Sequence, residues 1–167
     1  MEITKTYIGK LGTRKGKEFN VILDKEGEKL YNKYVWYVSS LGGVEYIIRK
    51  DKSNNNKTIL FHRELLSCPE DKEIDHINRN TLDNRKSNLR CVTHSQNLMN
   101  TGMRKDNKSG HRGVSWFERD SKWEVKIQLD GKRKRIGYFT DFVLACDAYD
   151  KKAQELFGEY LGEVSNA

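Results

Sequence analysis

The stretch EIDHINRNTLDNRKSNLRCVTHSQN, residues 73–97, determines the expected fold of the first part of the chain. EIDHI is typical of a strand, NRNTLDNRKSN of a polar loop, and LRCVT of a second strand. SQNLMNTG then offers Ser95 as an N-cap and Gly102 as a stop, which predicts a short helix. The sequence therefore predicts strand, loop, strand and helix, in that order.

Three polar side chains of this stretch, Asp75, His76 and Asn97, form a candidate hydrolytic site. Cutting a phosphodiester needs a water nucleophile, a base, and positive charge near the reacting oxygens. A neutral imidazole such as that of His76 suits the base. The carboxylate of Asp75 and the amide oxygen of Asn97 suit a hard divalent cation. The alternative is ordinary surface chemistry, because Asp-His pairs and polar first helical turns are common.

The motifs DHIN, LDNR, SNLR and T-x-SQN occur here together and in order. Over residues 57–100 the sequence resembles the HNH nucleases, in the branch found in phage and intron-encoded homing endonucleases. That resemblance implies a ββα-metal core, with His76 as general base and with Asp75 and Asn97 holding one Mg²⁺ or Mn²⁺ ion. It implies that Asn88 braces the loop and takes no part in the chemistry. The four-cysteine zinc site of some relatives is missing.

Near this motif, two histidines could have either a structural role or a contact with phosphate, and two arginines are candidate phosphate contacts. His62 matches a histidine that is often present upstream in this branch, and we favour a bracing role over a phosphate contact. His94 is expected at the surface or as a cap, with phosphate contact as the alternative. Arg85 and Arg90 are expected to contact phosphate, because a guanidinium cannot act as a base at neutral pH.

The first sixty residues alternate apolar and polar side chains in short runs, which predicts antiparallel strands. The runs are KEFNVILD, KYVWYVSS, VEYIIRKD and KTILFH, separated by KEGE, LGG and SNNN. HRELLSC, residues 62–68, is a short helix or turn candidate.

A second pattern begins after residues 101–110, which are polar and predict a linker. HRGVSWF, KWEVKIQLD and KRKRIGYFT predict three strands, with a DGK hairpin between the last two. DFVLACDAYDKKAQELFG predicts a helix between Asp141 as N-cap and Gly158 as stop. Trp116 is expected in the core, and Phe117 is left open. The inward face of the helix is expected to carry Phe142, Ala145, Ala148, Tyr149, Lys152 and Leu156.

The second pattern is also strongly basic at its start. Residues 101–140 hold eleven Lys and Arg against five Asp and Glu, within a chain of net charge +7. Such a basic segment is typical of a protein that binds a polyanion, most often nucleic acid. The alternative is that the basic residues only form a solvated surface. The outward strand face should carry Glu124, Lys126 and Gln128, with Arg133 and Arg135 beside them. Arg suits guanine and Gln suits adenine in the major groove.

This region is similar to the plant APETALA-type (ethylene-response-factor) DNA-binding domain. The matching segments are RGV (112–114), W-x-V-x-I (123–127), IGYFT (136–140), A-x-D-AYD-x-x-A (145–153) and FGEY (157–160). The resemblance implies a sheet that enters the major groove, with Arg112, Lys126, Gln128, Arg133 and Arg135 as DNA-binding residues. Ser115, Phe117 and Lys126 replace base-reading Arg and Trp positions, so the plant target sequence is not expected.

The sequence as a whole predicts an α+β protein with a nuclease domain at 1–100, a linker at 101–110 and a DNA-binding domain at 111–167. We expect a metal-dependent, site-recognising endonuclease that acts on double-stranded DNA, as a monomer, with a dimer left open. An inactive DNA-binding regulator and an RNA-directed protein are the alternatives. No CxxC pair occurs, which excludes a zinc site of four thiolates within this chain. The odd cysteine count argues against a disulfide framework and for a reducing, intracellular setting in a bacterial host or phage. No run has membrane-spanning length.

Overall fold

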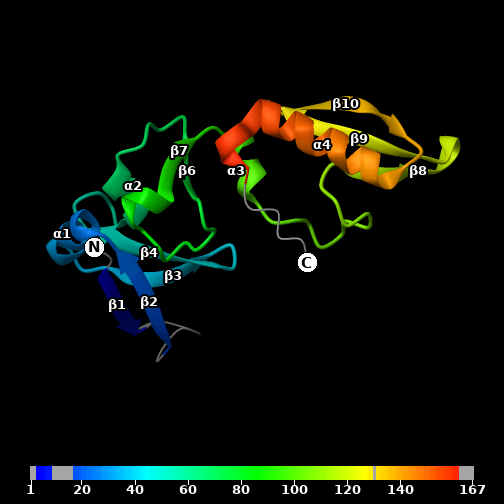
Figure 1. The fold of residues 1–167 in the computed structure, drawn as a ribbon. Coiled ribbons are helices and arrows are strands. Elements are labelled where there is room, and N and C mark those ends of the chain that lie inside the picture. Colours follow the sequence, from blue (N-terminus) through cyan, green and yellow to red (C-terminus); the bar gives the residue numbers. More distant parts are fainter. Residues whose placement is uncertain (1–2, 9–16, 130, 162–167) are drawn as a thin grey trace. The chain divides into compact units, whose positions relative to one another are not determined.

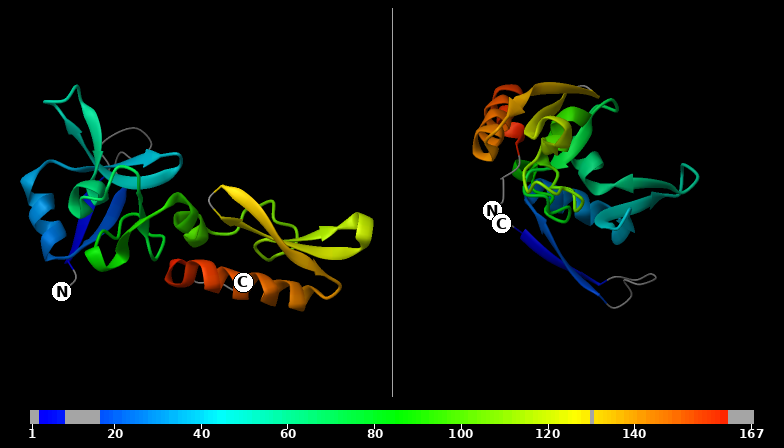
Figure 2. Two further views of the ribbon diagram at one scale, coloured as in Figure 1. Left: turned by 90° about the horizontal axis from the view of Figure 1, so that it is seen from above. Right: turned by 90° about the vertical axis from the view of Figure 1, so that its right-hand side faces the viewer.

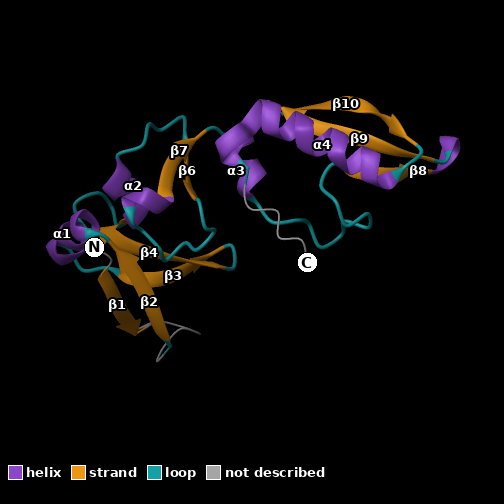
Figure 3. Ribbon diagram, viewed as in Figure 1, coloured by secondary structure: helices purple, strands orange, loops and turns teal. Residues whose placement is uncertain are grey.

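The computed structural model describes residues 3–8, 17–129 and 131–161 (Figure 1). Parts of the expected N-terminal strand region (9–16), of the DGK hairpin (Asp130) and of the C-terminal domain (162–167) lie outside the described residues. The protein is α+β, with small antiparallel sheets and short helices, as expected (Figure 3). The chain divides into two compact units, Met1–Val92 and Thr93–Ala167. The domain limits expected from the sequence stay a prediction.

The first unit contains the strands that the alternating runs predict. A two-stranded sheet and a three-stranded sheet of order β3-β4-β5 are both antiparallel. Their strands are β1 (Ile3–Ile8), β2 (Glu18–Leu23), β3 (Tyr37–Leu41), β4 (Val44–Asp51) and β5 (Lys57–Leu60). Helix α2 (Phe61–Leu66) follows β5 directly and confirms the short helix expected there.

Helix α1 (Lys25–Lys33) is a correction, because we expected KEGE to be only a break between strands. The side chain of Asp24 caps this helix by accepting from the backbone N–H of Gly27 at 2.8 Å. Acidic residues in its first turn and Lys33 in its last turn match the helix dipole. Only two large apolar side chains of α1 pack on the core, so its helical period is weak in the sequence.

The core of the first unit lies between β2, β4 and α2. Val21, Leu23, Trp36, Ile47 and Phe61 are buried together. The Trp36 and Phe61 rings meet edge to face, with centroids 4.8 Å apart. Burying side chains of this size supplies the main stabilisation of the unit and fixes the start of α2.

A hairpin of β6 (Glu73–His76) and β7 (Leu89–Val92) confirms the predicted strand–loop–strand order. The loop between them ends in a short 3-10 helix, η2 (Lys86–Asn88). Strand β2 holds this loop, because Ile22 donates to the carbonyl of Leu82 at 3.0 Å and accepts from Asn84 N–H at 2.8 Å. The second carboxylate oxygen of Asp24 accepts from the N–H of Lys86 at 2.8 Å. The N-terminal strands therefore fix the loop of the candidate site.

Helix α3 (His94–Asn100) confirms the predicted short helix but corrects its ends. Thr93, not Ser95, is the N-cap, and it forms a capping box with Gln96. The helix ends at Asn100, before Gly102.

The second unit continues with three strands and one long helix, as predicted. Its antiparallel sheet has the order β10-β9-β8, and α4 packs across one face of it (Figure 2). The elements are β8 (Val114–Phe117), η3 (Glu118–Asp120), β9 (Lys122–Leu129), β10 (Lys132–Phe139), α4 (Phe142–Phe157) and η4 (Gly158–Tyr160). Asp141 and Gly158 are the caps of α4, as expected.

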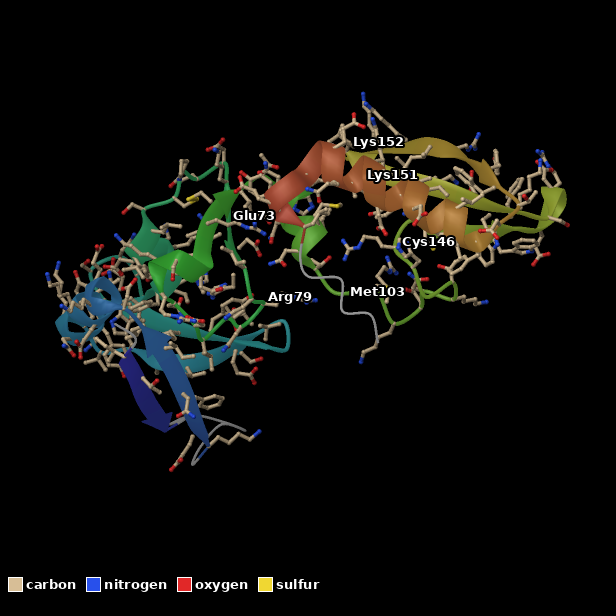
Figure 4. The ribbon with its side chains drawn as sticks, viewed as in Figure 1. Glu73, Arg79, Met103, Cys146, Lys151 and Lys152 are labelled. Carbon is tan, nitrogen blue, oxygen red and sulfur yellow. A yellow bond between two sulfur atoms is a disulfide. The ribbon has the colours of Figure 1, made fainter. Side chains whose placement is uncertain are left out.

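The core of the second unit corrects two expectations. Its buried residues include Val125, Ile127, Ala145 and Tyr149. Trp116 is 43 % exposed and touches Trp123 only through an edge contact, with centroids 5.1 Å apart. Lys152 is not on the buried face of α4, where Ala153 and Phe157 take the next positions. It pairs with Glu155 instead, and Figure 4 shows it on α4 beside Lys151.

The cysteines also depart from expectation. Cys68 and Cys91 form a disulfide, with Cα atoms 5.9 Å apart, and Cys146 is a free thiol. An odd total leaves room for one pair, so the count alone could not exclude it. None of the described helices combines the length and apolar character needed to span a membrane.

Candidate functional site

His76 ends strand β6 and is only 6 % exposed. Its Nε2 lies 3.4 Å from Oδ1 of Asn84, a fully buried residue of the loop. The amide nitrogen of Asn84 is held in place, because Nδ2 donates to the carbonyl of Thr81 at 3.2 Å. Oδ1 is therefore the atom that faces the ring, and it favours the tautomer with the proton on Nε2.

A second buried imidazole, His62 of α2, lies against the first. The His62 and His76 rings meet edge to face at 5.1 Å, and Tyr46 lies 5.7 Å from His62. Burial, with the charges of His76 and Arg63, lowers the pKa of His62 to about 3. Burial also lowers the pKa of His76, against the opposing effects of Asn84, Asp75 and Asp83. Both imidazoles are neutral at neutral pH, which is the form that can accept a proton.

Asp75 precedes His76 on β6 and is 5 % exposed. It pairs across the hairpin with Arg90, whose Nε and Nη2 lie 2.8 and 2.7 Å from Asp75 Oδ2. Neighbouring residues of a strand point to opposite faces, so a twist of β6 would be needed for Asp75 and His76 to approach one phosphate group from different sides. Arg90, which the sequence indicated as a phosphate contact, thus already neutralises a buried carboxylate.

The loop of the site is held by side-chain amides and one buried acid. Asn88 Oδ1 accepts from the N–H of Asn78 at 3.0 Å, and Asn88 Nδ2 donates to Asn78 Oδ1 and to the carbonyl of Asp83. Asp83 is fully buried and accepts from Arg85 Nε at 2.8 Å and from Asn78 Nδ2 at 2.7 Å. Asn88 and Asp83 together brace the loop that carries Asn84.

The remaining residue of the expected triad, Asn97, lies on α3 in the second unit. Its backbone N–H donates to the carbonyl of Thr93 at 2.9 Å. Its convergence with Asp75 on one ion stays a prediction.

No cluster of three or more His, Cys, Asp or Glu side chains suited to a metal is present in the described part of the chain. A site of one carboxylate and one amide oxygen, completed by phosphate and water, would not form such a cluster. The donor chemistry of Asp75 and Asn97 fits a hard divalent cation.

The expected DNA-binding residues of the second unit lie largely on the outer face of the β8–β9–β10 sheet. Lys126 and Arg135 both pair with Glu124, which is 5 % exposed. Arg133 makes no side-chain hydrogen bond or ion pair with any residue that the structure describes. Arg112 is placed differently, because its guanidinium donates to the carbonyls of Leu98, Thr101 and Gly102. It anchors the end of α3 and the segment that follows.

A groove of about 470 Å³ runs between this sheet and the segment 101–107. Lys126, Gln128 and Arg133 line one side, and Arg104 and Arg112 also line it. Arg104 forms an ion pair with Asp106, whereas Arg133 makes no ion pair with any described residue. The groove is therefore lined by both paired and unpaired cationic side chains.

Sequence reasoning missed the specific roles of Asn84, Asp83 and Glu124. The LDNR motif marked the loop as unusually polar, but no spacing rule indicates which amide meets the imidazole. Strict alternation placed Glu124 on the solvent face, and only the neighbouring strand β10 shows that this carboxylate is covered.

Comparison with known proteins identifies the family of the segment that contains the β6–β7 hairpin. A family model described as HNH endonuclease matches residues 67–99. The chain is 31 % identical over 156 residues to the uncharacterized HNH endonuclease L560 of Acanthamoeba polyphaga mimivirus, covering 92 % of this chain and 78 % of that protein. It is 35 % identical over 60 residues to protein 3.8 of Escherichia phage T7, covering 36 % and 50 %. No solved structure matches.

The hairpin with its buried Asp75–His76 pair and the polar loop belong to a nuclease domain, whose substrate is a nucleic acid. The chain belongs to the HNH endonuclease family.

Proposed function

We propose that this protein is a metal-dependent, site-recognising DNA endonuclease of the homing type. The observation that carries the proposal is the buried, neutral imidazole of His76, oriented by Asn84 beside Asp75 in the β6–β7 hairpin. Such an arrangement suits proton abstraction from a water. Membership of the HNH endonuclease family supports a phosphodiester as the bond that is cut.

In this proposal His76 accepts a proton from the attacking water, and Asn84 holds the ring through Nε2. Attack at phosphorus breaks the bond to the 3′ oxygen and leaves a 5′ phosphate. Asp75 and Asn97 would hold one Mg²⁺ or Mn²⁺ ion, which when bound supplies positive charge beside the phosphoryl and leaving oxygens. His62 packs against His76 and restricts its ring.

In this proposal Arg85 and Arg90 contact phosphate. Each of them also binds a buried carboxylate, Asp83 for Arg85 and Asp75 for Arg90. Arg90 would exchange part of its contact with Asp75 for a phosphate oxygen when DNA binds. Arg85 keeps two bonds to Asp83 and is partly exposed, so it can touch a phosphate without leaving its partner. Arginine suits this double duty because its guanidinium has five donors.

The second unit would position the enzyme on duplex DNA through the outer face of its sheet. Its three strands and covering helix are compatible with the APETALA-type domain that its sequence resembles. The proposed contacts on or beside that face are Lys126, Gln128, Arg133 and Arg135. Arg112 would act indirectly, by holding the segment 101–107 that lines the groove. A monomer with one catalytic site would nick one strand, and a double-strand break would need a second event or a dimer. An intracellular setting in a bacterial host or phage-infected cell stays a proposal, and the Cys68–Cys91 disulfide removes the cysteine argument for it.

A plasmid-cleavage assay tests the catalytic part. We expect Mg²⁺-dependent nicking by the wild-type chain and a loss of about 10²- to 10⁴-fold in rate for His76→Ala, the usual effect of removing a general base. His111→Ala is the control, because it removes an imidazole of the second unit that packs on Tyr149 and Asp150 and has no role in the proposed chemistry. A fully active His76→Ala protein would remove the proposed base. Wild-type binding of duplex without cleavage of any substrate would favour the inactive regulator, and preference for structured RNA would favour the RNA-directed reading.

A further inference from the structure

Glu124 is a buried carboxylate in the middle of a surface proposed to bind a polyanion. Three donors surround it on the outer face of the sheet: Lys126 Nζ lies 2.6 Å from Oε2, Arg135 Nε lies 2.8 Å from Oε1, and Tyr138 Oη donates to Oε1 at 3.2 Å. Burial raises the pKa of Glu124, but the bonds from Lys126 and Arg135 outweigh it and lower the pKa below 4.5. Glu124 is therefore ionised at neutral pH.

The same contacts fix the orientation of Arg135. Its Nε is bound to Glu124, and its guanidinium carbon lies 4.9 Å from the centre of the Tyr138 ring. The Tyr138 ring in turn packs against Phe117 of β8 at 5.4 Å. No further hydrogen bond of Arg135 occurs among the residues described here, and about half of its side chain is exposed. Its two terminal amino groups are available to an outside acceptor.

A negative charge at this place weakens attraction to any phosphate, so it does not serve affinity. A guanidinium held by Nε and by a ring has already lost its rotamer freedom and presents two coplanar donors. The acceptor pair that matches two such donors on duplex DNA is O6 and N7 of guanine in the major groove.

We propose that Glu124 is a specificity-determining residue that fixes Arg135 to read a guanine and restrains sequence-independent phosphate binding. This rests on the proposed role of the sheet as the DNA-binding face. Glu124 acts through Arg135 and Lys126 and does not itself contact the base.

Selection from a randomised duplex pool tests the inference, with the full-length chain in EDTA so that no strand is cut. We expect the wild-type chain to enrich a motif with a fixed guanine. Glu124→Gln should lower the preference for that guanine by about tenfold or more, and should strengthen binding to an unrelated duplex several-fold. Glu155→Gln is the matched control, because it removes an equal charge from another Lys-paired glutamate, on α4. It should change neither property.

Arg135→Lys is the second variant, and it keeps the positive charge while losing the two coplanar donors. It should lose preference for the same guanine, and it applies even if Glu124→Gln fails to fold, which thermal unfolding would show. If the wild-type chain enriches a motif and both variants enrich it equally well, the role of Glu124 and Arg135 is wrong while DNA reading by the sheet stands. If the wild-type chain enriches nothing, the proposed DNA-reading function fails and this inference fails with it.

Discussion

Three buried carboxylates, Asp75, Asp83 and Glu124, each accept hydrogen bonds from an arginine. Burial of an unpaired carboxylate is costly, so each acid needs its partner for the fold. The arginines, Arg90, Arg85 and Arg135, are among the residues proposed to contact DNA. Part of the positive charge of the chain therefore stabilises the protein, and fewer arginine donors remain for an outside partner than the sequence count indicates.

The stability that Asp83 contributes should depend on pH. Burial raises its pKa, but its bonds to Arg85 and Asn78 outweigh this and lower the pKa below 3.8. A depressed pKa means that the contribution is present above pH 3.8 and is lost as the pH falls further. Asp83→Asn should therefore lower the free energy of unfolding by about 2 kcal/mol at pH 7, and by less at pH 3.

Urea unfolding at the two pH values measures this difference. Asp106→Asn is the control, because Asp106 is bound to Arg104 in the same bidentate way but is exposed. It should leave the free energy of unfolding nearly unchanged. An equal loss for Asp83→Asn at both pH values would show that its charge is not what stabilises the loop.

At the scale of elements, segments far apart in the sequence fix one another. Strand β2 bonds to the loop between β6 and β7, and Asp24 both caps α1 and binds the N–H of Lys86. In the second unit, Arg112 ties the end of α3 to the start of β8. Periodicity identified most of these elements, because their apolar faces are regular. Sequence periodicity missed α1, because most of its nine residues are charged and only a short apolar pattern remains. The sequence also placed the N-cap of α3 two residues late, at Ser95 instead of Thr93.

Gly113 marks a close approach between β8, β9 and α4. Its φ of +70° is in the left-handed region, and a Cβ there would overlap the Tyr149 ring and the carbonyl of Lys126. Gly113→Ala should lower the free energy of unfolding of the second unit by about 3 kcal/mol or more, from overpacking and backbone strain together. Thermal or denaturant unfolding measures the loss.

Gly110→Ala is the matched control for this substitution. Gly110 has a similar φ of +76°, but no atom lies within 4 Å of the added Cβ. Only the backbone strain remains, so Gly110→Ala should lower the free energy of unfolding by about 1 kcal/mol. Equal losses at both glycines would show that the contact with Tyr149 is not a constraint.

At the scale of the whole molecule, the chain combines a nuclease hairpin with a basic sheet, and the two activities should separate. Chelation of divalent metal by EDTA should stop cleavage while duplex binding persists, because the proposed DNA contacts of the sheet are side-chain cations that need no metal. Binding should weaken steeply as salt rises. Gel-shift and nicking assays on one duplex measure both activities, with Mg²⁺ restored as the control. Loss of binding in EDTA would show that the metal contributes to the grip on DNA.

The sequence by itself determined the order of the main elements, the nuclease motif and the basic character of the second unit. These depend on local spacing, apolar alternation and charge, which are properties of neighbouring residues. Only the tertiary structure decided that Asn84 faces His76, that Arg90 neutralises Asp75, and that Glu124 is buried beneath Lys126 and Arg135. Each of these is a contact between different elements or between distant turns of one loop. Such a contact depends on strand register and on the cost of burying a polar group, and neither can be read from one segment alone.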